Sequence, residues 1–180
     1  MVPKNALDNP LVLPMLGLLV EQPRHAYALF RELTRRYEYL RVRNATVYTL
    51  LDRLTAEGWV TAASGNDRAA IAVTESGVAE LAKRVQQQLR EADLTGGPTF
   101  VTALAYLGIL RPAEAVTVLE RRVELIRGEV RELERAAHDP AEPEVHMIEV
   151  QYLLSRLRHD IDWLEGTARR IAAGELSWIR

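Results

Sequence analysis

Apolar positions in the first part of the chain recur at helical spacing in three stretches. Residues 11–20 are apolar almost without interruption, which predicts a buried helix behind the N-cap candidate Asn9. Pro14 lies inside this run, so the regular helix either begins near it or bends there. Residues 25–37 and 44–57 repeat apolar side chains every three or four positions, and each repeat predicts an amphipathic helix.

After Gly58 the apolar and polar residues alternate, with a period of two. Glycine is suited to the left-handed backbone conformation just after a helix. The alternating runs 59–63 and 68–73 flank the turn-forming residues 64–67, which predicts a β-hairpin. Residues 74–77 then open a fourth helix. Three helices, a two-stranded hairpin and a further helix are the order of elements in a winged helix-turn-helix.

The clearest domain boundary is Thr-Gly-Gly-Pro-Thr at residues 95–99. We therefore predict a winged helix-turn-helix domain over residues 1–92 and a helical domain over residues 99–180. The second domain begins with a short apolar helix over residues 100–110. The predicted fold class is mostly α, with a small two-stranded β wing and a C-terminal α-helical hairpin.

Two heptad-like series of apolar residues occupy the rest of the second domain, on either side of the proline-containing breaker 138–143. Their alternating spacings of three and four predict an antiparallel helical hairpin with coiled-coil-like packing. A long, thin hairpin leaves a face uncovered, and a second copy related by a two-fold axis is the commonest cover. The predicted dimerisation residues are Leu119, Val123, Ile126, Val130, Val150, Leu154, Leu157, Ile161 and Leu164.

The formal net charge of −2 conceals an asymmetry between the two halves of the chain. Residues 1–90 carry 12 basic and 9 acidic side chains, whereas residues 91–180 carry 11 basic and 16 acidic ones. A local basic patch on a mildly acidic chain is typical of a phosphate-contacting module, although a solvated helix face explains it equally well. The patch consists of Arg24, Arg31, Arg35, Arg36, Arg41 and Arg43.

Enzyme chemistry finds little support in the sequence. Cysteine is absent, and there is neither a Gly-x-Ser-x-Gly motif nor a glycine-rich phosphate loop. The densest polar clusters are His146 with Glu149, and His159 with Asp160 and Asp162; such helical neighbours are far more often surface pairs than metal ligands. We predict no catalytic residue, no metal and no cofactor. The longest apolar stretch is too short to span a membrane, and we expect a cytoplasmic location.

Four segments resemble the PadR family of transcriptional regulators. Residues 44–60, Asn-Ala-Thr-Val-Tyr-Thr-Leu-Leu-Asp-Arg-Leu ending in Glu-Gly-Trp-Val, are similar to its recognition helix, the most specific motif of the family. Residues 16–29 resemble its first two helices, and Thr-Glu-Ser-Gly at 74–77 its post-wing segment. Residues 149–164 resemble the C-terminal domain of longer members, which include virulence-gene activators. Two departures stand out: the wing reads Arg-Ala-Ala-Ile at 68–71 in place of a basic and aromatic strand, and Ala45 replaces a common glycine.

The resemblance implies a DNA-binding regulator whose recognition helix enters the major groove with its N-terminal residues. Thr46 and Thr49 would reach base edges or phosphates, and Val47 would pack on a thymine methyl group. The family implies a phosphate contact for Tyr48; the alternative is a half-buried core tyrosine. Arg53 could equally form a surface pair with a neighbouring carboxylate. The predicted DNA-binding residues are Arg41, Arg43, Asn44, Thr46, Val47, Tyr48, Thr49, Arg53 and Arg68.

PadR-like regulators are often released from DNA by phenolic or drug-like compounds, so the resemblance also implies a small aromatic effector. Tyr106, Tyr152 and Trp163 are candidates for its pocket, although helical aromatic residues at apolar positions more often belong to a core. We predict a homodimeric repressor that reads a two-fold symmetric site on double-stranded DNA, with activation left open. The alternative is a helical protein-interaction module whose winged helix does not bind DNA, and the salt dependence of binding distinguishes the two.

Overall fold

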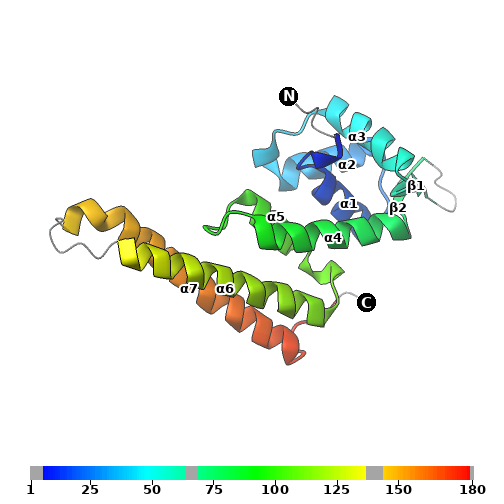
Figure 1. Ribbon diagram of the computed structural model, residues 1–180. Coiled ribbons are helices and arrows are strands. Elements are labelled where there is room, and N and C mark those ends of the chain that lie inside the picture. Colours follow the sequence, from blue (N-terminus) through cyan, green and yellow to red (C-terminus); the bar gives the residue numbers. More distant parts are fainter. Residues whose placement is uncertain (1–5, 64–68, 137–143, 179–180) are drawn as a thin grey trace. The chain divides into compact units, whose positions relative to one another are not determined.

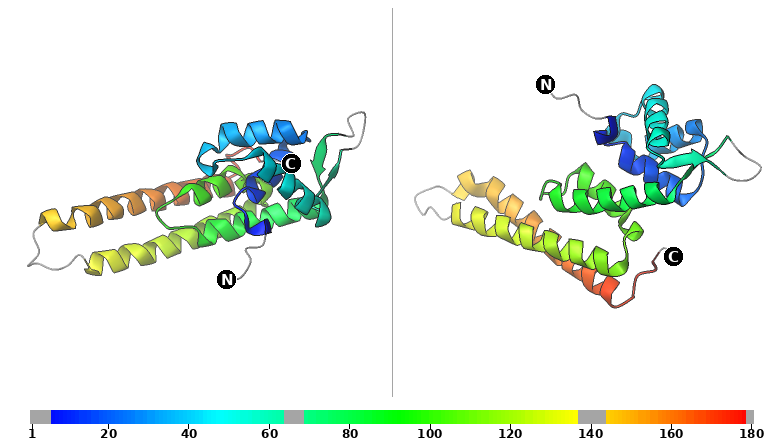
Figure 2. Two further views of the ribbon diagram at one scale, coloured as in Figure 1. Left: turned by 90° about the horizontal axis from the view of Figure 1, so that it is seen from above. Right: turned by 45° about the vertical axis from the view of Figure 1, so that its right-hand side comes forward.

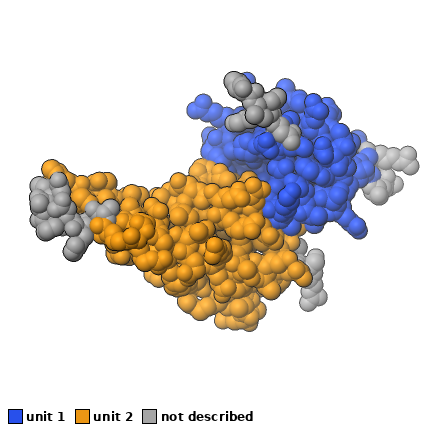
Figure 3. Space-filling model, viewed as in Figure 1, with its two compact units in different colours: residues 1–85 blue, residues 86–180 orange. Residues whose placement is uncertain are grey.

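The computed structural model describes residues 6–63, 69–136 and 144–178. The chain divides into two compact units, residues 1–85 and 86–180 (Figure 3). Among the described residues, no helix combines the length and the apolar character that a membrane span requires.

The first unit is a winged helix-turn-helix, as predicted (Figure 1). The antiparallel wing pairs Val60 with Val73 and Ala62 with Ile71, and the predicted turn over residues 64–67 lies outside the described residues. Its elements are η1 (Ala6–Asp8), α1 (Val12–Glu21), α2 (Ala26–Arg36), η2 (Glu38–Leu40), α3 (Asn44–Ala56), β1 (Val60–Ala62), β2 (Ile71–Val73) and α4 (Glu75–Glu91), the last of which continues into the second unit.

Helix α1 runs through Pro14 without interruption, because the proline lies in its first turn. The first backbone N–H that needs a partner within this helix belongs to Met15, which donates to the Leu11 carbonyl over 2.9 Å. Asn9 holds the entry to the helix with its side-chain oxygen, which accepts a hydrogen bond from the Leu11 N–H at 2.9 Å. The helix is buried almost all round, as its apolar run predicted, and forms the centre of the unit.

One junction ties the end of α3 and the wing to the start of α4. Gly58 adopts the left-handed conformation, with φ of 71°. Its carbonyl accepts hydrogen bonds from the hydroxyls of Thr74 (2.6 Å) and Ser76 (2.8 Å). The Thr74 hydroxyl also caps α4 by accepting from the Gly77 N–H at 3.1 Å. Gly77 lies so close to the Trp59 carbonyl that an added Cβ would stand 2.1 Å from its oxygen.

The second unit contains a short helix followed by a long antiparallel helical hairpin (Figure 2). The prediction of a single helix over residues 100–110 was wrong, because the backbone of Tyr106 leaves the helical conformation. Gly108 also lowers the helical preference of the segment that follows. The breaker at residues 138–143 lies outside the described residues. The elements are α5 (Pro98–Ala105), η3 (Leu107–Ile109), α6 (Pro112–Ala136), η4 (Glu144–Met147) and α7 (Ile148–Ala172).

The predicted heptad residues mostly form the interior of this hairpin within one chain. Val150 and Ile161 are partly exposed, whereas the other seven are buried between α6 and α7. Their apolar surface therefore stabilises the hairpin itself, and a second copy would have to use a different face. The buried seven are Leu119, Val123, Ile126, Val130, Leu154, Leu157 and Leu164.

A buried arginine fixes the last turn of α4 against α6. Arg122 is 1% exposed, and its Nη1 donates to the carbonyls of Leu89 (3.0 Å) and Ala92 (3.1 Å). Its Nη2 donates to the Asp93 carbonyl at 2.6 Å, and the guanidinium lies 3.9 Å from the ring centroid of Phe100. Carbonyls at a helix C-terminus carry partial negative charge, so they are suited to hold a cation. Burial lowers the pKa of Arg122 from its usual value, and the charges of Asp160 and Asp93 oppose that shift.

We expect Gly77→Ala to destabilise the first unit by about 3 kcal/mol, because the new Cβ would collide with a backbone oxygen that cannot move aside. The measurement is chemical denaturation followed by circular dichroism. Gly128→Ala is the matched control, since a Cβ there meets only Arg131 Nη2 at 4.0 Å. Alanine should raise stability at that helical position by about 0.5 kcal/mol or more. Equal stability of wild type and Gly77→Ala would contradict this account of the junction.

Candidate nucleic-acid interface

The predicted recognition helix, α3, begins at Asn44, the first residue of the predicted range 44–57. Asn44 is its first helical residue, and Arg43 takes the N-cap position with an extended backbone. The Arg43 carbonyl accepts hydrogen bonds from the N–H groups of Thr46 (3.0 Å) and Val47 (3.2 Å), so the chain already turns into the helix there. Asn44 is consequently exposed on the first turn, and no side chain makes a capping hydrogen bond.

Helix α3 has one buried face and one exposed face. Val47 is fully buried, so the prediction that its side chain packs on a thymine methyl group was wrong. Its position one turn before Leu50 and Leu51 places it in the row that packs on the core. The exposed residues of the helix include Asn44, Ala45, Tyr48, Thr49, Asp52 and Arg53.

The polar residues of the exposed face differ in their exposure and in the hydrogen bonds and ion pairs that they form within the chain. Tyr48 is 47% exposed, so about half of its side chain is open to solvent. Thr49 donates its hydroxyl to the Ala45 carbonyl at 3.0 Å but keeps acceptor lone pairs. Thr46 is partly exposed. Arg53 forms no ion pair with Asp52, Glu57 or any other residue that the structure describes.

A tight turn places two arginines directly before α3. Arg41 has φ of 47°, and within the described ranges it alone combines a side chain with a left-handed backbone. Its N–H donates to the Glu38 carbonyl at 3.1 Å, closing the short η2 turn. Arg41 and Arg43 are both exposed and make no ion pair with described residues. Arg68, the predicted phosphate ligand of the wing, lies outside the described residues.

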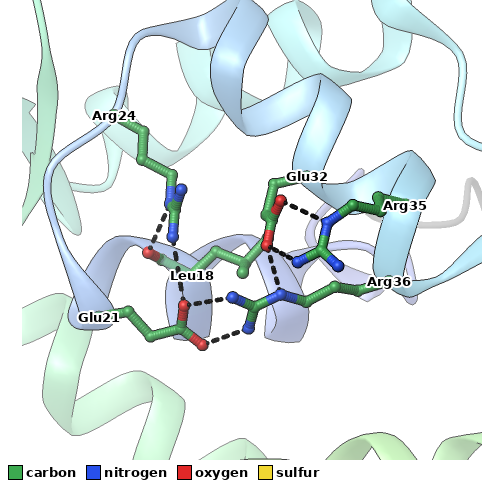
Figure 4. Close-up of polar contacts among 6 residues, drawn as sticks. All are labelled: Leu18, Glu21, Arg24, Glu32, Arg35 and Arg36. Carbon is green, nitrogen blue, oxygen red and sulfur yellow. Dashed lines mark hydrogen bonds and ion pairs between the residues drawn. The ribbon is translucent and has the colours of Figure 1, made fainter.

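Half of the basic patch recognised in the sequence is neutralised by two carboxylates (Figure 4). Glu21 pairs with Arg24 at 3.2 Å and with Arg36 at 2.6 Å. Glu32 pairs with Arg35 at 2.6 Å and with Arg36 at 2.5 Å. Hydrogen bonds, foremost from Arg35, hold the pKa of Glu32 at about 2 against the usual 4.5. The Glu21–Arg36 pair joins α1 to α2 across fifteen positions, which no local spacing rule could reveal.

The three aromatic residues predicted to line an effector pocket do not form one compact cluster. Tyr152 and Trp163 are 61% and 48% exposed on α7, about 16 Å apart along the helix axis. Tyr106, by contrast, is 9% exposed, beside α5. Within the described part of the chain, no three His, Asp or Glu side chains gather as metal ligands would.

Comparison with known proteins gives a family match for most of the first unit. Residues 15–83 match the model of the transcriptional regulator PadR-like family. We call this segment, which is similar to that family, the PadR-like domain. The resemblance seen in the sequence is thereby confirmed for this part of the chain. The matched segment holds most of α1, all of α2, α3 and the wing, and most of α4, and therefore the whole junction at Gly58 and Gly77.

The solved structures that match include several of Bacillus subtilis PadR. One is 20% identical, with a TM-score of 0.39 over 96% of this chain and 99% of that one. A complex of that protein with operator DNA is 19% identical, with a TM-score of 0.38 over 89% and 98%. A complex with p-coumaric acid is 20% identical, with a TM-score of 0.38 over 91% and 99%. No curated protein matches, so the assignment of the PadR-like domain rests on the family model.

We expect Glu32→Gln to lower stability at neutral pH by about 1 kcal/mol, since surface ion pairs rarely contribute more. A carboxylate with a depressed pKa stabilises fully above its unfolded-state pKa. Its contribution should therefore be complete above pH 4.5, fall between pH 4.5 and 2, and vanish below. Thermal unfolding of both proteins across this range measures it. A difference that stays constant down to pH 2 would contradict the ion-pair explanation.

Proposed function

We propose that this protein is a DNA-binding transcriptional regulator. The observation that carries the proposal is the division of α3 in the PadR-like domain. One face is locked into the core by Val47, Leu50 and Leu51, while the other presents a tyrosine, a threonine and uncommitted arginine charge to solvent. A helix of this kind can enter the major groove without exposing apolar core.

The work of binding would be divided between phosphate and base contacts. Arg41 and Arg43 precede the helix, and their free guanidiniums are suited to neighbouring phosphates. The Tyr48 hydroxyl would add a further phosphate contact. Thr46 and Thr49 would reach base edges from the first turns, with Asn44 beside them. Few side chains of the helix can read bases, which favours a site composed of two half-sites.

We further propose a homodimer that represses by occupying a promoter, released by a small effector. The apolar residues between α6 and α7 are used within the chain, but α7 keeps an exposed apolar row. Ile148 and Tyr152 are 63% and 61% exposed and one helical turn apart, and Trp163 lies about 16 Å further along α7, beyond the exposed Arg156 and His159. Exposed aromatic and aliphatic side chains in a row are typical of a protein interface.

We expect the protein to bind DNA from its own upstream region with an affinity that falls steeply between about 50 mM and about 200 mM salt. Arg43→Gln should weaken binding about tenfold and reduce the salt slope by about one, because one phosphate contact is lost. Tyr48→Phe should weaken binding at both salt concentrations. Fluorescence anisotropy measures each affinity.

Arg131→Gln is the matched control. Arg131 is also an exposed arginine, but it belongs to α6 and is distant from α3 in the sequence. It should bind DNA like the wild type. Equal binding of wild type and Arg43→Gln would remove α3 from the interface. Absence of salt-sensitive binding to any fragment of the upstream region would favour the protein-interaction module instead.

We expect Ile148→Glu combined with Tyr152→Glu to weaken dimerisation at least about tenfold, since a charge in an apolar contact costs more than 1.4 kcal/mol. Sedimentation equilibrium of the full chain measures the constant. Val101→Glu, at a 58% exposed apolar position of α5, is the control that should leave it unchanged. A dimer that tolerates both α7 substitutions would rule out this face.

A further inference from the structure

A groove of about 450 Å³ lies in the second unit between the last turns of α4 and the first half of α6. Gln86 and Arg90 line it from α4, and Ala113, Glu114, Val118 and Arg121 line it from α6. Val118 is buried, and the lining combines apolar side chains with polar and charged ones. The groove is open to solvent, so a small molecule bound in it would keep one side exposed.

The two helices that form the groove are held together by the buried Arg122, one position beyond Arg121. Its hydrogen bonds to the carbonyls of Leu89, Ala92 and Asp93 fix the end of α4 on α6. The walls of the groove are therefore positioned by contacts that do not involve any ligand. A preformed site loses less conformational entropy when it binds.

The charges in the groove are predominantly positive and uncommitted. Arg90 and Arg121, one from each wall, are exposed and form no ion pair with residues that the structure describes. Glu114 is already occupied, because its carboxylate accepts hydrogen bonds from the Arg111 guanidinium (2.6 Å) and the Arg111 N–H (3.0 Å). Two free guanidiniums thus face the same space, with the one carboxylate of the lining engaged by Arg111.

We propose that this groove binds a small organic dianion with an apolar body, such as a phosphate monoester of an aromatic alcohol. Guanidinium groups bind phosphate and carboxylate oxygens with paired hydrogen bonds, so arginines on both walls match a doubly charged group. The apolar body would lie on Val118 and Ala113, and the Gln86 amide would donate to a remaining oxygen.

Such a ligand would contact α4, a continuous helix whose other end belongs to the PadR-like domain. Helix α4 runs from Glu75 to Glu91, its last turns line the groove, and its first turn is fixed to Gly58 and Trp59 just behind α3. A ligand on Arg90 would therefore contact the helix whose start is hydrogen-bonded to the residues that follow the recognition helix. This regulatory role rests on the proposed function, whereas the binding site itself does not.

The test is isothermal titration of the full chain, without DNA, against phenyl phosphate at about pH 8, where the phosphate is doubly charged. We expect saturable binding with one site per chain. Phenyl sulfate has nearly the same shape but one charge, and inorganic phosphate has no apolar body, so both should bind at least about fivefold more weakly. Arg90→Gln and Arg121→Gln should each weaken phenyl phosphate about tenfold, the effect of one charge-assisted hydrogen bond.

Arg131→Gln, an exposed arginine elsewhere on α6, should leave the affinity unchanged. Binding that is insensitive to Arg90→Gln would overturn the proposal, and so would equal affinity for the three anions or no binding at all. Because Arg121 also lines a neighbouring groove between α6 and α7, loss in Arg121→Gln alone would overturn it as well. DNA is absent from this titration, so its failure is distinguishable from failure of DNA binding in the anisotropy experiment.

Discussion

The burial of Arg122 is the constraint on which the arrangement of the second unit depends. Removing a guanidinium from water is costly unless its donors are satisfied. Here three carbonyls at and just beyond the end of α4 accept from its two terminal nitrogens, while the Phe100 ring covers its face. Among the described residues, the buried Nε of Arg122 has no hydrogen-bond partner. The three carbonyls are therefore the hydrogen-bond acceptors that this guanidinium depends on. Arg122 thereby links the end of α4 and the Phe100 ring of α5 to α6, beside the groove.

Much of the fold could be predicted from the sequence because the apolar periodicity is strong. The order of elements in the PadR-like domain, the left-handed Gly58 and the α6–α7 hairpin each leave a local signal of spacing or turn chemistry. What could not be predicted depends on distant partners. The Arg122 clamp joins positions about thirty residues apart, and the close approach of Gly77 to Trp59 becomes visible only when the wing is folded.

The candidate interface was predicted less well than the fold, for two physical reasons. Val47 lies in the sequence beside residues that face solvent, but the helical period turns it into the core. The basic patch looked uniform, yet Glu21 and Glu32 engage three of its six arginines. The sequence shows how many arginines are present; only their partners show how much charge remains for DNA.

The two faces of α3 also bear on how such a protein can change over time. Residues that anchor the helix, such as Val47 and Leu54, are distinct from those that face solvent, such as Tyr48 and Thr49. Substitutions on the solvent face leave the core packing untouched, so they carry little stability cost. Duplicated copies of such a gene could therefore diverge in what the exposed face of α3 binds while keeping the same folded scaffold, with no need for compensating changes in the interior.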